Sequence, residues 1–488
     1  MYRKQYTGQL KMDIPFGVNL NADDKWVRLA EMMPWKEIEE EYHCHFKGQE
    51  GQIAKSARLA FGALYIQMSE GFTDVQTCTH IRQNPYFQYF CGFESYTTEE
   101  PFHASMMTHF RKRISMEMIR RITLSVFGTP AKEEPDNEME PDTEYEDGQT
   151  QIPTEVENKG TLILDATCCP ADIAYPTDIG LLNQSREISE EIIDILYETV
   201  KSQFEYKPRT YRNKARKEYL AYTKKRHHSD KETRKTIRGQ LQYVSRNFRT
   251  IERLMEQGAS LTSLDRQKYR KLLVIREIHR QQKSMYDARC HRIDGRIVSI
   301  SQPHIRPIVR GKTHDPTEFG AKVAIGLVGG YAFLTSADWE NFSEATVLKE
   351  AAEQYREAFG TYPKVIIGDR AYPTRDNRDW CKEHDIRLSG PRAGRKSLQF
   401  MAVEQKQIYQ DSCERNAVEG EFGVVKRRYS LDRIMAKLPD TSFSSIAMGF
   451  FVANMERKLR LLFVPDGDWA LDYDFELSSL VIFSRSFG

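Results

Sequence analysis

Two apolar segments of strand length, far apart in the chain, each end in an aspartate. They are residues 160–165 and 364–369, and their last residues are Asp165 and Asp369. Between them, residues 320–335 form a hairpin pattern around a Gly-Gly pair, and helical patterns follow. Strands that alternate with helices indicate an α/β core, whose first strand is separated from the others by a long insertion. Further short strands are expected at residues 172–175, 296–300 and 386–388.

The composition is that of a soluble globular protein with more than one domain. Of the 488 residues, 40% are hydrophobic and 29% are charged, which is enough apolar material for a core and argues against a chain disordered throughout. No run of 18 or more uncharged apolar residues occurs, so we expect no membrane span. The first six residues lack an apolar signal segment, and we therefore expect a cytoplasmic location.

The eight cysteines are scattered and form no CxxC pair. In a cytoplasmic chain this spacing predicts reduced thiols and neither a disulfide framework nor a zinc site. The run His43-Cys44-His45 is the tightest ligand-like cluster. Alternate positions seldom converge on one metal, so we do not expect zinc there.

Apolar residues recur at helical spacing through most of residues 22–127. One of the helical segments, residues 103–127, contains a basic run that includes Arg111 and Arg113. Several short helices followed by a basic one suit a helix-turn-helix-like module, in which these arginines contact DNA. The alternative is a helical bundle with a solvated charged face.

Charge is distributed very unevenly, although 71 basic and 70 acidic residues give a net charge of only +1. Residues 129–158 are crowded with acids and punctuated by prolines, which predicts a flexible linker or, alternatively, an internal mimic of phosphate. The helical segment 185–295 is rich in lysine, arginine and tyrosine. Such a surface attracts a polyanion, and the alternative is a solvated helical hairpin. Its candidate DNA contacts are Lys224, Lys225 and Arg226.

A third acidic residue lies on a long helix expected at residues 408–429. Arg415, Glu419 and Lys426 fall on one face of this helix at about 100° per residue, beside an apolar stripe. The row is either a surface ion-pair ladder or a metal-binding carboxylate beside two phosphate contacts. An isolated aspartate at a strand end is commonly a cap or turn residue, so the hypothesis of a site depends on all three acids meeting in one crevice.

Three carboxylates suit phosphodiester chemistry. That reaction needs an activated oxygen nucleophile and a stabilised leaving oxygen, and two Mg²⁺ ions about 4 Å apart provide both. Mg²⁺ prefers hard oxygen ligands and keeps water molecules, so a few carboxylates suffice.

With these motifs in order, the sequence resembles the bacterial insertion-sequence DDE transposases, which have a ribonuclease-H-like catalytic domain. The Arg-x3-Glu-x6-Lys spacing of Arg415, Glu419 and Lys426 is the family's signature. A tyrosine often found three residues before the arginine is replaced by Ser412. The other matching segments are Leu164–Thr167, Tyr175–Leu182, Gln302–Gly311, Glu318–Lys322 and Gly368–Tyr372.

The resemblance implies that Asp165, Asp369 and Glu419 hold two Mg²⁺ ions, for which Mn²⁺ substitutes. Arg415 and Lys426 would contact the backbone of the transposon end. Water would cleave the end, and the freed 3′-hydroxyl would attack target DNA. The implied partner is double-stranded DNA, comprising terminal inverted repeats and target, bound by a homodimer at the bacterial nucleoid. An aromatic past the hairpin, Trp339, would stack on an unstacked end base or pack in the core.

The expected architecture is an α/β ribonuclease-H-like catalytic core with a large helical insertion, plus an all-α N-terminal DNA-binding domain. The boundaries are a helical DNA-binding domain at 1–128, an acidic linker at 129–158, the first part of the core at 159–184, a basic insertion at 185–295, the second part of the core at 296–435 and a C-terminal packing segment at 436–488.

Two other functions fit parts of the pattern. A metal-dependent nuclease without strand transfer would use the same carboxylates. A DNA-binding regulator with an inactive site would have no need for three acids that face phosphate. A metal-dependent cleavage assay separates these classes, because a pure binder shifts DNA without cutting it.

Overall fold

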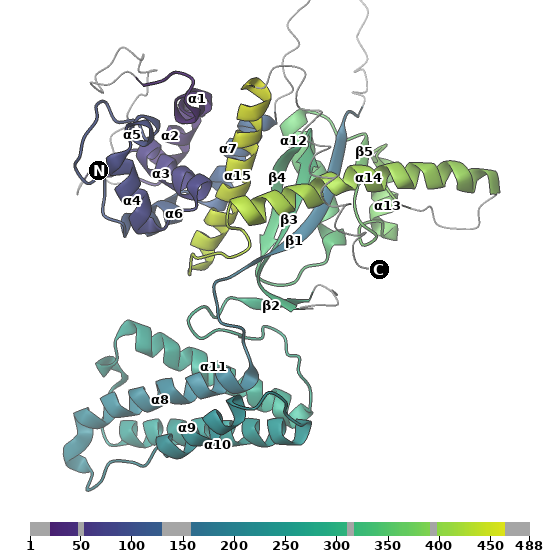
Figure 1. Ribbon diagram of the computed structural model, residues 1–488. Helices are drawn as coiled ribbons and strands as arrows, with labels where there is room; N and C mark the ends of the chain where they lie inside the picture. The colour runs from purple at the N-terminus through teal and green to yellow at the C-terminus, as the bar shows by residue number, and fades with distance from the viewer. Residues whose placement is uncertain (1–19, 47–52, 129–157, 310–316, 391–397, 464–488) are drawn as a thin grey trace, which may run out of the picture.

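The computed structural model describes residues 20–46, 53–128, 158–309, 317–390 and 398–463. The elements form three groups, which are the N-terminal helices, a central sheet with its covering helices, and a helical insertion (Figure 1). The acidic linker predicted at 129–158 falls outside the described residues, apart from its last position.

The N-terminal segment is helical, as its periodicity predicts. Helix ends follow local capping, since the Ser56 side chain accepts a hydrogen bond from Leu59 N, and Gly71 ends the same helix in the left-handed region at φ 69°. The helices are α1 (Lys25–Met32), α2 (Trp35–His43), α3 (Ala57–Glu70), α4 (Asp74–Gln83), α5 (Pro85–Phe90), α6 (Met106–Arg113) and α7 (Met116–Phe127).

The central sheet is mixed and has the order β2-β3-β1-β5-β6, with β4 also paired to β3. β1 runs antiparallel to β3 and parallel to β5, and β5 runs parallel to β6. The predicted hairpin joins β3 to β4 through Gly329 and Gly330, which both have positive φ. The strands are β1 (Thr161–Pro170), β2 (Arg306–Val309), β3 (Thr317–Val328), β4 (Tyr331–Asp338), β5 (Val365–Ile367) and β6 (Arg387–Leu388).

Three strand predictions are wrong in detail. The first strand does not end at Asp165, because its pairing with β3 continues from Ile163 to Pro170. Residues 172–175 form no strand, and Ala171 makes only an isolated bridge to Ile434. Residues 296–300 form none either. The chain there passes between the insertion and the sheet and pairs with β3 only from Arg306 onward.

Helices cover both faces of the sheet, as the alternation of side chains along β1 requires. Leu162 and Leu164 pack against α12 (Leu348–Phe359). Ile163 and Cys169 belong to the cluster that includes α14 (Leu398–Arg428) and α15 (Pro439–Phe463). A short 3-10 helix, η3 (Glu344–Val347), precedes α12, and α13 (Arg375–Glu383) follows β5.

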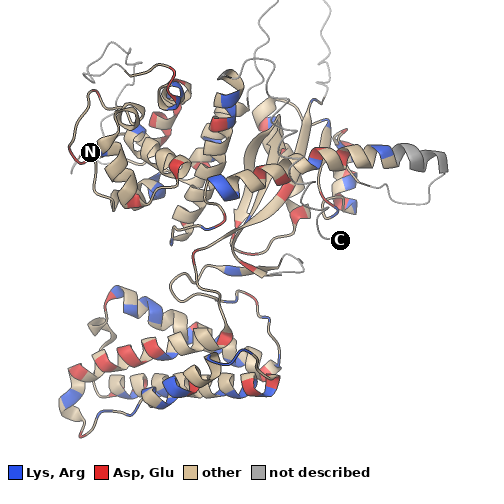
Figure 2. Ribbon diagram, viewed as in Figure 1, with Lys and Arg blue, Asp and Glu red and all other residues tan. Residues whose placement is uncertain are grey.

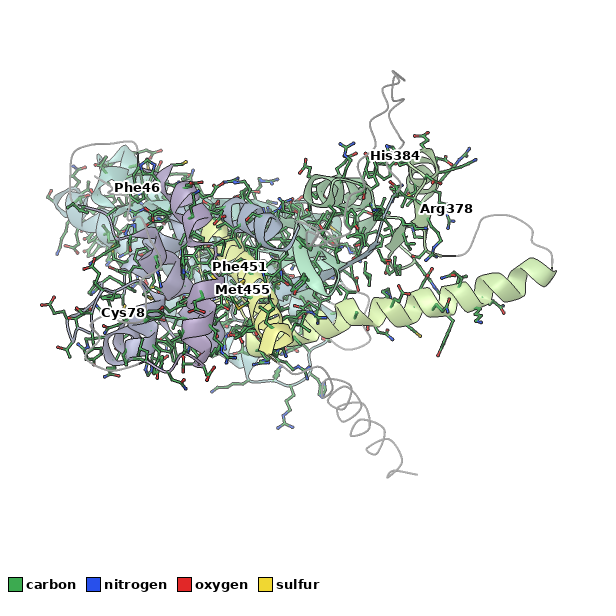
Figure 3. The ribbon with its side chains drawn as sticks, turned by 90° about the horizontal axis from the view of Figure 1, so that it is seen from above. Phe46, Cys78, Arg378, His384, Phe451 and Met455 are labelled. Carbon is green, nitrogen blue, oxygen red and sulfur yellow. The ribbon has the colours of Figure 1, made fainter. Side chains whose placement is uncertain are left out.

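Helix α15 joins the N-terminal helices to the sheet in one hydrophobic core. Phe451 lies edge-on to Phe61 with ring centroids 5.4 Å apart, and Asn454 exchanges two 2.8 Å hydrogen bonds with the backbone of Ala332 in β4. From above, Phe451 lies between the N-terminal helices and the sheet (Figure 3). The apolar segment predicted to pack near the C-terminus is therefore the element that ties the two groups together.

The insertion is a helical unit with its own hydrophobic core. It begins at Asp178 rather than at residue 185, because the Thr177 side chain caps the helix by accepting from Gly180 N at 3.1 Å. Its ends are tied together where Asp178 accepts 2.6 Å hydrogen bonds from Gln282 and Arg296. The helices are α8 (Asp178–Val200), α9 (Arg212–Thr223), α10 (Asp230–Glu256) and α11 (Arg266–Ala288). None of the helices described is long and apolar enough to cross a membrane.

Candidate active site

Asp165 and Asp369 are brought together by the parallel pairing of β1 with β5. The last paired residues are Ile163 and Ile367, so each aspartate lies two positions beyond them and on the same face as its neighbour. Asp165 is half-buried inside β1, and Asp369 is half-buried in the turn after β5. Two acids at adjacent positions of one sheet form the centre of the candidate site.

The Asp165 carboxyl is in a desolvated and strongly charged environment. Burial raises its pKa to about 6, while a hydrogen bond from Ala166 N and the charge of Arg415 oppose the rise. The negative charges of Glu344 and Asp369 add to it. Positive charge from α14 and two further carboxylates therefore all act on this one group.

The loop after β5 is built around Asp369. The Asp369 side chain accepts a 2.7 Å hydrogen bond from Ala371 N, and its carbonyl oxygen accepts one from Tyr372 N at 3.2 Å. Tyr372 is 1% exposed and packs over Gly368, where an added Cβ would lie 2.7 Å from the tyrosine ring. This close approach explains why glycine precedes the aspartate.

Glu344 in η3 is an acidic residue of this region that our sequence analysis missed. It pairs with Lys322 of β3 at 3.1 Å, and the two side chains are only 21% and 12% exposed. It lies at the start of a short helix after an irregular segment, where neither helical nor strand periodicity marks a functional position.

The third predicted acid, Glu419, lies on α14 and points to solvent. Its carboxylate accepts a 3.0 Å hydrogen bond from Arg415, four residues earlier, and its side chain is 56% exposed. Within the residues that the structure describes, no three Asp, Glu, His or Cys side chains lie close enough to hold one metal ion. The structure thus joins Glu419 to Arg415, and Arg415 electrostatically to Asp165.

Lys426 lies further along α14 and is half-buried. Its charge acts on Cys168 of β1, whose pKa is raised by burial and by Glu318 of β3. The lysine therefore lies over the same strand as Asp165, on the side toward Pro170.

Three other predicted DNA contacts are engaged within the protein. Arg111 is 12% exposed and bonds to Asp74 and, at 2.7 Å, to Gln67. Arg113 lies over the Phe46 ring at 4.9 Å. Trp339 packs against His304 and Phe443, with ring centroids 4.4 and 5.0 Å away, so both arginines and the tryptophan have internal packing roles.

The basic residues predicted in the insertion are exposed. Lys224, Lys225 and Arg226 occupy the turn between α9 and α10, where Lys225 pairs with Glu232 at 2.5 Å. Among the ion pairs of the described residues, none includes Lys224 or Arg226. Basic residues crowd α9, α10 and α11, whereas α8 carries mostly acidic ones (Figure 2).

The raised pKa of Asp165 predicts a pH-dependent gain in stability for Asp165→Asn. The folded state holds this carboxyl at a pKa of about 6, above the model value of 3.8, so its ionisation destabilises the fold at pH 8 and its protonation relieves this as the pH falls through 6. We expect the variant to be more stable than the wild type by about 1–2 kcal/mol at pH 8, with a smaller difference at pH 5. Urea denaturation at both pH values measures this, and a difference that grows at pH 5 would contradict it.

Comparison with known families confirms the resemblance to DDE transposases at both ends of the described structure. Residues 366–456 match the transposase DDE domain, which includes Asp369, Arg415, Glu419 and Lys426. Residues 17–113 match the transposase domain DUF772. The DDE domain implies a ribonuclease-H-like fold, in agreement with the mixed α/β sheet.

One curated relative comes from Rhizobium meliloti and is described as uncharacterized protein ORF8 in nfe locus. It is 33% identical over 103 residues, which are 21% of this chain and 49% of that protein. The chain therefore spans about half the length of this relative. No solved structure shows significant similarity to the chain.

Proposed function

We propose that this protein is a DNA transposase that hydrolyses phosphodiester bonds at the ends of a mobile element and joins the freed 3′-hydroxyl to target DNA. The observation that carries the proposal is the placement of Asp165 and Asp369 on neighbouring parallel strands, with the second inside the segment that matches the transposase DDE domain. The substrate is double-stranded DNA, comprising the inverted repeats of the element and its target.

The chemistry of the acids fits a divalent cation. Asp165 and Asp369 offer hard oxygen donors, which Mg²⁺ and Mn²⁺ accept, and Mg²⁺ completes its shell with water. Asp165 and Asp369 would hold a cation directly, and Glu419 would complete a two-ion site once its carboxylate leaves Arg415. A bound cation supplies electrostatic stabilisation to the attacking and leaving oxygens.

The cations of α14 have a complementary role in this proposal. Arg415 is hydrogen-bonded to Glu419 at 3.0 Å and acts on Asp165. A DNA phosphate that accepts hydrogen bonds from Arg415 would replace Glu419 as its partner. Lys426, on the same helix, would contact the adjoining backbone. Binding of the DNA end and release of Glu419 toward the two aspartates are then one event.

The test is a cleavage assay with labelled duplexes that carry the DNA flanking this gene. We expect binding in both Mg²⁺ and EDTA, cutting in Mg²⁺ only, and joined products when target DNA is added. Cutting without joining would identify a nuclease, and binding without cutting would identify a regulator.

The insertion would bind DNA through its basic side, which we propose contacts the end held by the second subunit of a homodimer at the nucleoid. Replacing Lys224, Lys225 and Arg226 with alanine should reduce the slope of log affinity against log salt by about 2, because each lost phosphate contact removes about 0.9. Electrophoretic shifts at several salt concentrations measure this slope.

The matched control is Arg280→Ala with Lys283→Ala in α11, whose cations are exposed but already paired with Glu277 and Asp287. An unchanged slope in the triple variant, or an equal change in the control, would show that the turn between α9 and α10 does not contact DNA.

A further inference from the structure

Glu344 is held close to the two aspartates by packing and hydrogen bonds on several sides. Its helix η3 packs through Val347 against Ala166 of β1 and Ala324 of β3. Ala166 is the residue after Asp165, so this packing places η3 beside the aspartate. On its other side Glu344 pairs with Lys322, which also donates a 2.8 Å hydrogen bond to the carbonyl oxygen of Phe342.

A buried amide links the Glu344 segment to the Asp369 loop. The Asn377 side chain is 3% exposed and donates two 2.8 Å hydrogen bonds, one to the carbonyl oxygen of Ala345 and one to that of Tyr372. Ala345 follows Glu344 directly, and Tyr372 closes the turn that begins at Asp369. The two acidic segments are thus fixed to each other.

A buried hydroxyl lies among the three carboxylates. Tyr372 is 1% exposed, and the described part of the chain gives its hydroxyl no hydrogen-bond partner. Burial raises the pKa of Tyr372 well above its usual value, and the charges of Glu344, Asp165 and Asp369 raise it further. A buried hydroxyl without a partner is costly. Its position next to three acids indicates a polar ligand, such as a hydrated cation, in the space they share.

We propose that Glu344 is a positioning residue of the cation site, which with Asp165 and Asp369 attracts and holds a hydrated divalent cation before DNA is bound. This inference rests on the proposed function, because it assigns a further residue to the same site. Mg²⁺ keeps several water molecules when one or two carboxylates bind it. Carboxylates that bind the water shell orient the ion without touching it.

The proposal divides the acids by the stage at which each acts. Glu344 serves the DNA-free protein, in which Glu419 is bound to Arg415. Glu419 joins when a phosphate takes over Arg415. Lys322 keeps its bond to the Phe342 carbonyl oxygen in the absence of Glu344, so the fold tolerates loss of the Glu344 charge.

The experiment measures Mn²⁺ binding to the full chain without DNA, by the electron paramagnetic resonance signal of free Mn²⁺ at pH 8. We expect Glu344→Gln to raise the dissociation constant about 10-fold and Asp369→Asn to abolish tight binding. Glu419→Gln should stay within about twofold of the wild type, as should the control Glu357→Gln, which removes an exposed acid from α12. Glu344→Asp retains the charge and should recover most of the affinity, which a structural role confined to side-chain size would not explain.

The outcomes separate this inference from the proposed function. Wild-type affinity in Glu344→Gln together with weak binding in Asp369→Asn would overturn the role of Glu344 and leave the two aspartates as the site. Equal losses in Glu344→Gln and Glu344→Asp would also overturn it. If the wild type binds no Mn²⁺ without DNA, the early role of Glu344 is wrong, whereas absence of Mg²⁺-dependent cutting would overturn the proposed function itself.

Discussion

Asp369→Asn is expected to lower the rate of Mg²⁺-dependent cleavage on the order of 10³-fold while DNA affinity stays within about twofold. The substitution removes the negative charge that the cation requires. It keeps the side-chain oxygen that accepts the 2.7 Å hydrogen bond from Ala371 N, so the turn after β5 remains folded. Loss of charge without loss of shape should separate chemistry from binding.

The measurement compares cutting and binding of the same labelled duplex by the wild type and the variant. Asp379→Asn is the matched control, because Asp379 is an exposed acid on the neighbouring helix α13. Retained cutting by the variant would remove Asp369 from the reaction. Loss of DNA binding would instead assign it a structural role.

Much of the core could be predicted from the sequence because its signals are local. The glycine pair at 329–330 has the backbone freedom that a tight hairpin needs, and the structure forms that hairpin. The helical periodicity of residues 22–127 likewise gives helices. The length of β1 could not be predicted, because its continuation past Asp165 depends on pairing with β3, more than 150 residues away.

The candidate site is only partly readable from the sequence for a related reason. Strand ends identify Asp165 and Asp369, and parallel pairing then places them together. Glu344 carries no such signal, because η3 reaches the site through packing on Ala166 and through Asn377. Helical spacing identifies the row that contains Glu419 but does not say that Arg415 occupies its carboxylate.

Basic residues illustrate the same limit. Arg111 belongs to a cationic run, yet Asp74 and Gln67, which lie on or beside other helices, accept its hydrogen bonds. Sequence charge does not distinguish a cation paired at long range from one that is free. Lys224 and Arg226 differ because their turn projects from the insertion, where few acids lie close.

The second large effect is expected in the insertion, whose core contains a buried ion pair on α8. Arg186 is 1% exposed and donates to both carboxylate oxygens of Glu190 at 2.7 Å, and Glu190 is 5% exposed. Asn183 and Glu187 accept further hydrogen bonds from the same guanidinium, at 2.9 and 3.0 Å. Glu190→Gln removes the buried negative charge but keeps the size of the side chain, so the arginine loses its buried counter-charge. Breaking a buried pair in this way costs about 3 kcal/mol.

Because this chain has several structural units, hydrogen exchange read peptide by peptide is the suitable measurement. Peptides of α8 and α10 should exchange about 10²-fold faster in Glu190→Gln, the factor that corresponds to about 3 kcal/mol, while peptides of β1 and β3 serve as the internal control. The double variant Arg186→Met with Glu190→Met should recover most of the protection, since apolar residues replace a buried pair at little cost. Unchanged exchange in the single variant would mean that Glu187, which is 51% exposed, neutralises Arg186 alone. The buried position of Glu190 would then contribute shape rather than charge to the insertion.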